Sequence, residues 1–150
     1  MIEETNKNPL KQVLDLWDID SIIDSTEPGK ELIKIPTLHA KYVRIMMRNI
    51  ILSKELEQQL LALRKLKWDY YNGRLTQEEL EKYGWKQFKF ILKSEIKDYI
   101  EADNDVLKIM TQKTLHDEVV SCCQSILKEL QSRTYQLRSY IDWEKTIMGQ

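Results

Sequence analysis

One segment near the middle of the chain places cations among aromatic rings. It runs from Leu63 to Arg74 as LRKLKWDYYNGR, with Asp69 as its only acid. Cationic side chains neutralise phosphates and release counterions, while aromatic faces stack on unpaired bases of any identity. This pattern predicts sequence-independent binding of single-stranded nucleic acid. The residues that would carry it are the cations Arg64, Lys65, Lys67 and Arg74 and the aromatic residues Trp68, Tyr70 and Tyr71.

The same pattern arises when aromatic side chains pack a helix end and lysines face water, so composition alone does not decide the function. The distribution of charge favours a polyanion partner for this segment. Net charge is −4 over residues 1–35, +5 over residues 36–75, −3 over residues 76–105 and +1 over residues 106–150, although the total is only −1. A polyanion is therefore drawn to the second of these four regions.

Catalytic constellations are sparse. The two histidines, His39 and His116, fall on different predicted helices and fit no metal or triad spacing, and the four glycines are too far apart for a phosphate-binding loop. The sequence therefore predicts a protein that is not an enzyme and needs no cofactor.

A metal site and a metal-dependent nuclease are both disfavoured by the sequence. Cys122 and Cys123 diverge by about 100° on a helix, so a metal site with His116 is disfavoured and buried thiols are expected. A metal-dependent nuclease would use clustered acids, which charge-rich helix ends explain more simply. Those acids are Asp98, Glu101, Asp103 and Asp105.

The composition predicts long helices in a reducing compartment. Four Gly and three Pro among 150 residues, with 42% apolar and 31% charged residues, disfavour a strand-and-turn fold. No run of about 18 apolar residues and no apolar stretch after Met1 is present. We therefore expect an all-helical protein of single-domain size in the cytoplasm.

The first 35 residues predict a short helix and a loop. Asn8 is suited to the N-cap and Pro9 to the first helical position, and apolar residues follow on one face. Pro28 and Gly29 then stand among breaker residues. We therefore divide the chain into an N-terminal segment, residues 1–35, and a helical DNA-binding and oligomerisation domain, residues 36–150.

A helix of about 35 residues is predicted from Pro36 to Tyr71, because no Gly or Pro interrupts this stretch. Its heptad seam either forms an intramolecular core or mediates self-association, and a second apolar strip on the same helix keeps both readings open. The seam is Leu38, Tyr42, Ile45, Asn49, Leu52, Leu56, Gln59, Leu63, Leu66 and Tyr70, and the second strip is Val43, Met46, Met47, Ile50 and Ile51.

The next elements are predicted from local stop and start signals. Asn72 and Gly73 end the long helix, and a hairpin at this Asn-Gly pair is rejected because neither flank alternates over strand length. Thr76 and Glu79 form a capping box for a short helix that Gly84 closes.

Helical spacing then recurs over residues 85–101, and a last long helix is predicted from an N-cap at residues 103–105 through Trp143. A brief strand at residues 88–90 is the rival reading of the first stretch. The lysines of that stretch, Lys86, Lys89, Lys93 and Lys97, form a stripe that is either solvated or a secondary phosphate contact. The last helix carries a seam of Val120, Cys123, Leu127, Leu130, Leu137 and Ile141.

Three blocks of sequence carry a resemblance to a known family. They are LHAKY at residues 38–42, WDYYNGR at residues 68–74 and SRTYQLRSYIDWEKTIMG at residues 132–149, with YGWKQF and the DNDVLK stretch from Asp103 between the last two. In their order and spacing these blocks resemble the UvsY recombination mediators of tailed phages. The resemblance covers roughly residues 36–150, and the first 35 residues match loosely.

The resemblance implies an all-helical, homo-oligomeric ring, a heptamer in the family, that binds single-stranded DNA without sequence preference and consumes no nucleotide. It also implies two protein partners, the phage recombinase and the phage single-strand binding protein. Such mediators help the recombinase to load onto DNA covered by the binding protein. By their place before DYYNGR, Lys65 and Lys67 are the leading phosphate contacts, and Arg64 and Arg74 support them.

A ring also gives the two long apolar helices their partners, and it repeats one basic segment into a continuous track. The alternative is a helical scaffold or interaction protein with no nucleic-acid role. Such a protein would hold partner helices on the same seams and leave the basic segment solvated.

Overall fold

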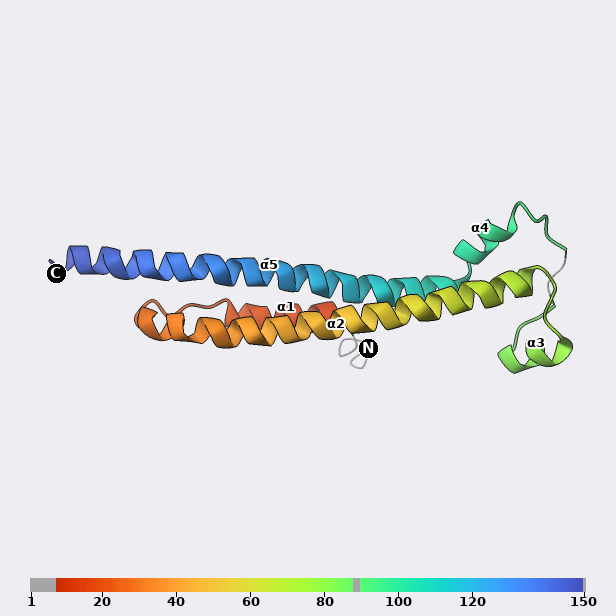
Figure 1. The fold of residues 1–150 in the computed structure, drawn as a ribbon, viewed down its shortest axis with the longest axis horizontal. Helices are drawn as coiled ribbons and strands as arrows, with labels where there is room; N and C mark the ends of the chain where they lie inside the picture. Colours follow the sequence, from red (N-terminus) through yellow and green to blue (C-terminus); the bar gives the residue numbers. More distant parts are fainter. Residues whose placement is uncertain (1–7, 88–89, 150) are drawn as a thin grey trace. The chain divides into compact units, whose positions relative to one another are not determined.

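The computed structural model describes residues 8–87 and 90–149, and helices make up its regular structure (Figure 1). In chain order they are α1 (Pro9–Asp20), α2 (Pro28–Tyr71), α3 (Gln77–Tyr83), α4 (Ile96–Glu101) and α5 (Asn104–Ile147). Those two stretches contain no strand, and the all-helical prediction is confirmed. Among the same residues, no helix is both long enough and apolar enough to cross a membrane.

The first helix begins at its predicted cap. The side-chain oxygen of Asn8 accepts hydrogen bonds from the N–H groups of Leu10 (3.0 Å) and Lys11 (3.2 Å), and Pro9 stands where no N–H partner is needed. The apolar face predicted after Pro9 consists of Leu10, Val13, Leu14 and Trp17. Of these, Val13 is buried whereas Leu14 remains 45% exposed.

The second helix begins at Pro28, so the start predicted at Pro36 is wrong. A proline fits the first turn because the N–H groups there have no acceptor within the helix. Pro36 lies inside α2, where it removes one N–H donor. Packing of its neighbours Ile35 and Leu38 against a buried core holds the helix together across this position.

The chain forms two compact units, and α2 and α5 each contribute to both. Unit 1 consists of residues 1–52 and 115–150, and unit 2 consists of residues 53–114. The sequence predicted a division by function, between residues 1–35 and 36–150. The two units are a division by packing, so the functional division stays a prediction.

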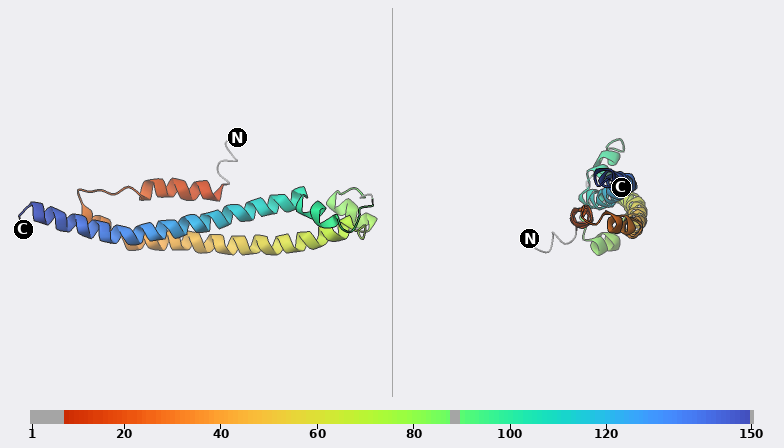
Figure 2. Two further views of the ribbon diagram at one scale, coloured as in Figure 1. Left: turned by 90° about the horizontal axis from the view of Figure 1, so that it is seen from above. Right: turned by 90° about the vertical axis from the view of Figure 1, so that its left-hand side faces the viewer.

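In unit 1, α1 lies beside the first half of α2 and the middle of α5, and the last turns of α5 extend beyond α1 (Figure 2). The buried core contains Val13, Tyr42, Val119, Cys123, Ile126 and Leu130. Polar contacts hold the end of α1: the Asp20 carboxylate accepts from Tyr42 (2.8 Å) and pairs with Lys41 (2.6 Å). The buried Arg133 donates to the carbonyls of Asp20 (3.2 Å) and Ser21 (3.0 Å), which satisfies acceptors at this helix end.

The predicted seam of α2 faces inwards over most of its length. Tyr42 and Asn49 are buried, and Gln59 is exposed. On the second apolar strip, Met47 is 50% exposed and Ile51 is 57% exposed. The seam therefore serves the intramolecular core, which leaves part of the second strip on the surface.

Unit 2 confirms the predicted caps and turns. Gly73 has φ 69° directly after α2, a left-handed conformation that suits glycine and ends the helix. The N–H of Thr76 donates to Glu79 Oε2 (2.8 Å) and the N–H of Glu79 to Thr76 Oγ1 (3.3 Å), which forms the capping box of α3. The core of this unit consists of Leu60, Ile91, Ile96, Ile100 and Val106.

The helix predicted over residues 85–101 is largely absent. Only Ile96–Glu101 forms a helix, α4, and residues 85–87 and 90–95 are not helical. Of the rival strand at residues 88–90, Phe88 and Lys89 lie outside the described residues, and Phe90 is not in a strand. Packing overrides the local periodicity here, because Ile91, Ile96 and Ile100 enter the core while Phe90 and Leu92 stay exposed.

The last helix starts from a cap within the predicted residues. Asp103 Oδ1 accepts from the N–H groups of Asp105 (2.9 Å) and Val106 (3.4 Å). The helix ends at Ile147 and not at the predicted Trp143. Of its predicted seam, Cys123, Leu130 and Leu137 are buried, and Val120, Leu127 and Ile141 are partly buried.

Candidate nucleic-acid interface

A tryptophan with two cations against it lies at the end of α2. Trp68 is 38% exposed, and Lys65 Nζ and Arg74 Cζ lie 5.0 Å and 4.5 Å from its ring centroid. Lys65 precedes Trp68 by three residues and therefore shares its helix face. Arg74 reaches the ring because the left-handed Gly73 reverses the chain, and its N–H donates to the Asp69 carbonyl at 2.9 Å.

Lys65 is open to an external anion. Its side chain is 69% exposed, and the one ion pair it makes within residues 8–87 and 90–149, with Asp69 at 3.2 Å, is a surface pair between residues four apart on a helix. Such pairs contribute little to stability, on the order of 0.5 kcal/mol. A phosphate can therefore replace the Asp69 carboxylate at the Lys65 ammonium, or bind the ammonium beside it, at low energetic cost.

Beside Trp68 lies a hollow of about 460 Å³, the Trp68 hollow, which collects charge from two parts of unit 2. Helix α2 and the segment at α4 both contribute to its wall. The polar and aromatic groups that line it are Arg64, Lys65, Trp68, Lys93, Lys97 and Glu101. Four cations against one acid make this surface attractive to an anion, and Arg64 already holds Glu101 in an ion pair at 3.2 Å.

The predicted lysine stripe does not exist as one helical face, because residues 85–87 and 90–95 do not form a helix. Lys93 and Lys97 nevertheless line the Trp68 hollow, whereas Lys86 lines a different one. The lysine stripe in the sequence was compatible with a secondary phosphate contact that included Lys93 and Lys97. The sequence did not predict that these two lysines lie beside Trp68.

Lys67, one of the two leading phosphate contacts predicted, has a different environment. Its side chain is 4% exposed, and its ammonium lies 3.0 Å from Asp103 Oδ2 and 2.9 Å from Asp105 Oδ2. The ammonium also lies 3.8 Å from the Trp85 ring centroid. Two carboxylates already neutralise Lys67, so this geometry favours a structural role for it.

Asp103 connects this ion pair to Tyr71. The Tyr71 hydroxyl donates to Asp103 Oδ2 at 2.7 Å. Burial alone would raise the pKa of Asp103, but the hydrogen bonds from Tyr71 and Lys67 and the charge of Lys67 outweigh it and hold the pKa below its usual range. Burial and the hydrogen bond to Asp103 raise the pKa of Tyr71 far above its usual value. The carboxylate is therefore the stable form in the folded chain.

This lowered pKa predicts a specific loss of stability in acid. A carboxyl group whose pKa is lower in the folded state contributes stability above its unfolded pKa, about 3.9, and loses it as the pH falls through the folded value. We expect the free energy of unfolding to decline below about pH 4, and Asp103→Asn to flatten this decline. Urea denaturation between neutral and acid pH measures it. An equally steep decline in Asp103→Asn would assign the acid sensitivity to other carboxylates, with Asp20 in unit 1 as the first to test, since its pKa is also lowered.

The other two aromatic residues of the predicted segment are engaged in packing. Tyr70 lies 5.0 Å from the Trp85 ring, and its hydroxyl donates to the Lys86 carbonyl at 2.6 Å. Tyr71 is partly buried on Asp103. Trp68 is thus the aromatic residue of LRKLKWDYYNGR with a ring most accessible to a base.

The side chains that the sequence offered for metal or catalytic chemistry have other partners, and Asp103 and Asp105 come together on Lys67. His116 Nδ1 lies 2.7 Å from Asn49 Oδ1, and Cys123 is fully buried in the core of unit 1. Burial raises the pKa of the Cys123 thiol to about 11. Across the described ranges, no three His, Cys, Asp or Glu side chains form a group that could hold a metal ion.

Comparison with known proteins adds a family to this geometry. The family described as "Recombination, repair and ssDNA binding protein UvsY" matches residues 16–150. The recombination protein uvsY of Enterobacteria phage T4 is 28% identical over 126 residues, which cover 82% of this chain and 85% of the phage protein.

Crystal structures of the bacteriophage T4 recombination mediator protein UvsY share the fold. The lattice type I structure matches with a TM-score of 0.77 at 24% identity, covering 90% of this chain and 98% of the other. The lattice type II structure matches with a TM-score of 0.78 at 24% identity, covering 92% and 96%.

Proposed function

The chain belongs to the UvsY family of recombination, repair and single-stranded-DNA-binding proteins, and from this we propose that it is a recombination mediator that binds single-stranded DNA without sequence preference. The observation that carries the proposal is the Trp68 hollow, where an exposed indole ring lies among four cations. Bases of any identity stack on an indole, and cations follow the phosphates, so neither contact reads sequence.

Around the Trp68 ring we assign the phosphate contacts to Lys65, which lines the hollow, and to Arg74, which contacts the ring without lining the hollow. Arg64, Lys93 and Lys97, which line the hollow, come second. Lys65 and Arg74 are exposed and touch the Trp68 ring, so each phosphate contact would lie beside a stacked base. Arg64 is partly engaged by Glu101. Lys67 would act by holding the start of α5 against the end of α2, since its ammonium is buried between Asp103 and Asp105.

The mediator function requires two further proteins, the phage recombinase and the phage single-strand binding protein. We propose that this protein holds the single strand while the recombinase displaces the binding protein and loads onto the DNA. Holding a strand by stacking and ion pairs needs neither bond chemistry nor nucleotide hydrolysis. The crystallised T4 protein with the same fold is itself described as a recombination mediator.

We further propose a homo-oligomeric ring, with seven subunits as the family implies. The exposed strip that includes Met47 and Ile51 offers apolar surface for contacts between subunits. A ring would repeat one Trp68 hollow per subunit. If each subunit neutralised about two phosphates, seven would neutralise about fourteen, and log K would fall with log salt with a slope near −10.

Fluorescence anisotropy of a labelled oligothymidine across a salt series tests both proposals. We expect tight binding with a steep salt slope for the wild type. In Lys65→Ala/Arg74→Ala we expect weaker binding and a slope reduced by about 0.7 for every phosphate that is no longer neutralised. Lys54→Ala, which removes an exposed lysine elsewhere on α2, is the matched control and should leave the slope almost unchanged.

The salt slope separates the outcomes. A slope near −1.4, the value for about two phosphates, would contradict a ring that acts as one binding unit. If the wild type bound no DNA at low salt, the alternative of a helical scaffold protein would stand instead. Equal losses in the double variant and in Lys54→Ala would show that charge in general, and not this hollow, attracts DNA.

A further inference from the structure

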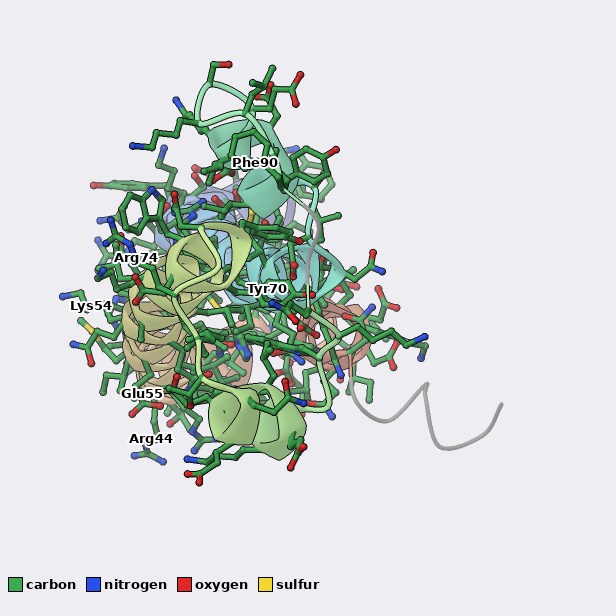
Figure 3. All side chains as sticks on the ribbon, turned by 90° about the vertical axis from the view of Figure 1, so that its right-hand side faces the viewer. Arg44, Lys54, Glu55, Tyr70, Arg74 and Phe90 are labelled. Carbon is green, nitrogen blue, oxygen red and sulfur yellow. The ribbon has the colours of Figure 1, made fainter. Side chains whose placement is uncertain are left out.

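A second hollow in unit 2, the Phe90 hollow, is lined by aromatic rings and shares no residue with the Trp68 hollow. Its volume is about 620 Å³. The residues that matter for its chemistry are Tyr70, Lys86, Phe90, Leu92, Glu95 and Tyr99. In Figure 3, Arg74, which touches Trp68, lies to the left of Tyr70 and Phe90.

The rim of this hollow leaves large apolar side chains in water. Phe90 is 92% exposed, Leu92 is 57% exposed and Tyr99 is 41% exposed. A phenyl ring gains free energy when a ligand covers it, and neighbouring exposed apolar groups mark binding surfaces more often than single ones do. These three side chains therefore form a surface that a ligand with a flat apolar face would stabilise.

The polar groups of the hollow restrict the class of ligand. Lys86 makes no ion pair with any described residue, and its backbone carbonyl is fixed by the Tyr70 hydroxyl at 2.6 Å. The ammonium can thus take a phosphate. The Glu95 carboxylate can accept from amino or imino groups at the edge of a base. Rings, a cation and an edge acceptor together suit a nucleotide better than an aliphatic side chain.

One short segment lines both hollows. Lys93 and Lys97 belong to the Trp68 hollow, whereas Leu92 and Glu95, which alternate with them, belong to the Phe90 hollow. A strand whose phosphates contact Lys93 and Lys97 therefore has the Phe90 hollow within reach of its next bases.

We propose that the Phe90 hollow is a second base-stacking subsite for single-stranded DNA, in which a base lies on the Phe90 ring while Lys86 contacts a phosphate. The inference rests on the proposed function, because it places the base of a strand that the Trp68 hollow also holds. The subsite adds affinity that depends on the bases and not on salt.

The test compares two oligonucleotides of equal charge, an oligothymidine and the same backbone with abasic sites, by anisotropy at several salt concentrations. The proteins are the wild type, Phe90→Ala and the control Ile33→Ala, which removes an exposed apolar residue from unit 1. Since Phe90 is 92% exposed, its removal leaves the fold intact. We expect Phe90→Ala to bind oligothymidine at least about fivefold more weakly, with an unchanged salt slope and unchanged binding to the abasic strand. Ile33→Ala should match the wild type.

Each other outcome overturns the subsite in a way that can be distinguished. If Phe90→Ala matches the wild type while Lys65→Ala/Arg74→Ala lowers the salt slope, the proposed function stands and the subsite is wrong. If light scattering shows that Phe90→Ala has fewer subunits, the hollow is a contact between copies of this chain. If the wild type binds neither strand, the proposed function itself fails.

Discussion

Lys67→Ala is expected to destabilise the chain by about 3 kcal/mol, whereas Lys65→Ala, two residues earlier, should change the free energy of unfolding by no more than about 0.5 kcal/mol. The difference arises because each substitution leaves a carboxylate without its cation, and only Lys67 has a buried partner. Removal of Lys67 leaves the buried Asp103 carboxylate without its cation. The expected loss is at the low end of the range for broken buried pairs, because Tyr71 and two backbone N–H groups still bind Asp103.

Urea denaturation followed by circular dichroism measures this difference. The double variant Lys67→Met/Asp103→Asn is the informative control, because it removes both buried charges and keeps an apolar stem against the Trp85 ring. We expect it to recover part of the lost stability. If Lys67→Ala unfolded like the wild type and reduced the salt slope as much as Lys65→Ala does, Lys67 would be a phosphate contact, as the sequence predicted.

Trp68→Ala is expected to lower the affinity for single-stranded DNA by about 1–3 kcal/mol per stacked base, with little effect on the salt slope. In a ring the loss would recur at every subunit, which makes this the largest effect expected on DNA binding from one substitution. Trp68 as a residue is 38% exposed, so Trp68→Ala also removes buried apolar surface and is expected to lower the free energy of unfolding. Circular dichroism should therefore show that the variant is folded before DNA is added.

Trp68→Phe separates stacking from the general loss of a large side chain, because it keeps an aromatic face. We expect it to retain most of the affinity. The change in intrinsic fluorescence that follows DNA addition should shrink, since a stacked base quenches the indole that has been removed. If Trp68→Ala bound oligothymidine as tightly as the wild type, the Trp68 hollow would hold DNA by charge alone, and stacking there would be disproved.

The sequence by itself determined the features whose partners are near neighbours along the chain. Asn8, Thr76 with Glu79, and Asp103 satisfy backbone groups two or three residues away, so their caps were predictable. Gly73 likewise ends α2 through its own backbone conformation. The ordered blocks WDYYNGR and SRTYQLRSYIDWEKTIMG predicted the family, which the family match over residues 16–150 confirms.

Tertiary structure decided what depends on distant partners. Local spacing predicted a helix over residues 85–101, but burial of Ile91 in the core of unit 2 draws this segment out of helical register. The start of α2 was misplaced for a related reason, since Pro36 breaks a helix locally while packing of its neighbours preserves it.

In the candidate site, too, some features follow from the local sequence and others depend on distant partners. Composition predicted that cations and aromatic rings gather at LRKLKWDYYNGR, and the structure places Lys65, Trp68 and Arg74 together on one surface. Residues two apart on a helix point about 200° apart, so Lys65 and Lys67 could not share that surface. Which of the two faces water depends on the carboxylates that meet Lys67, and these lie more than thirty residues further along the chain. Only the folded chain brings them together.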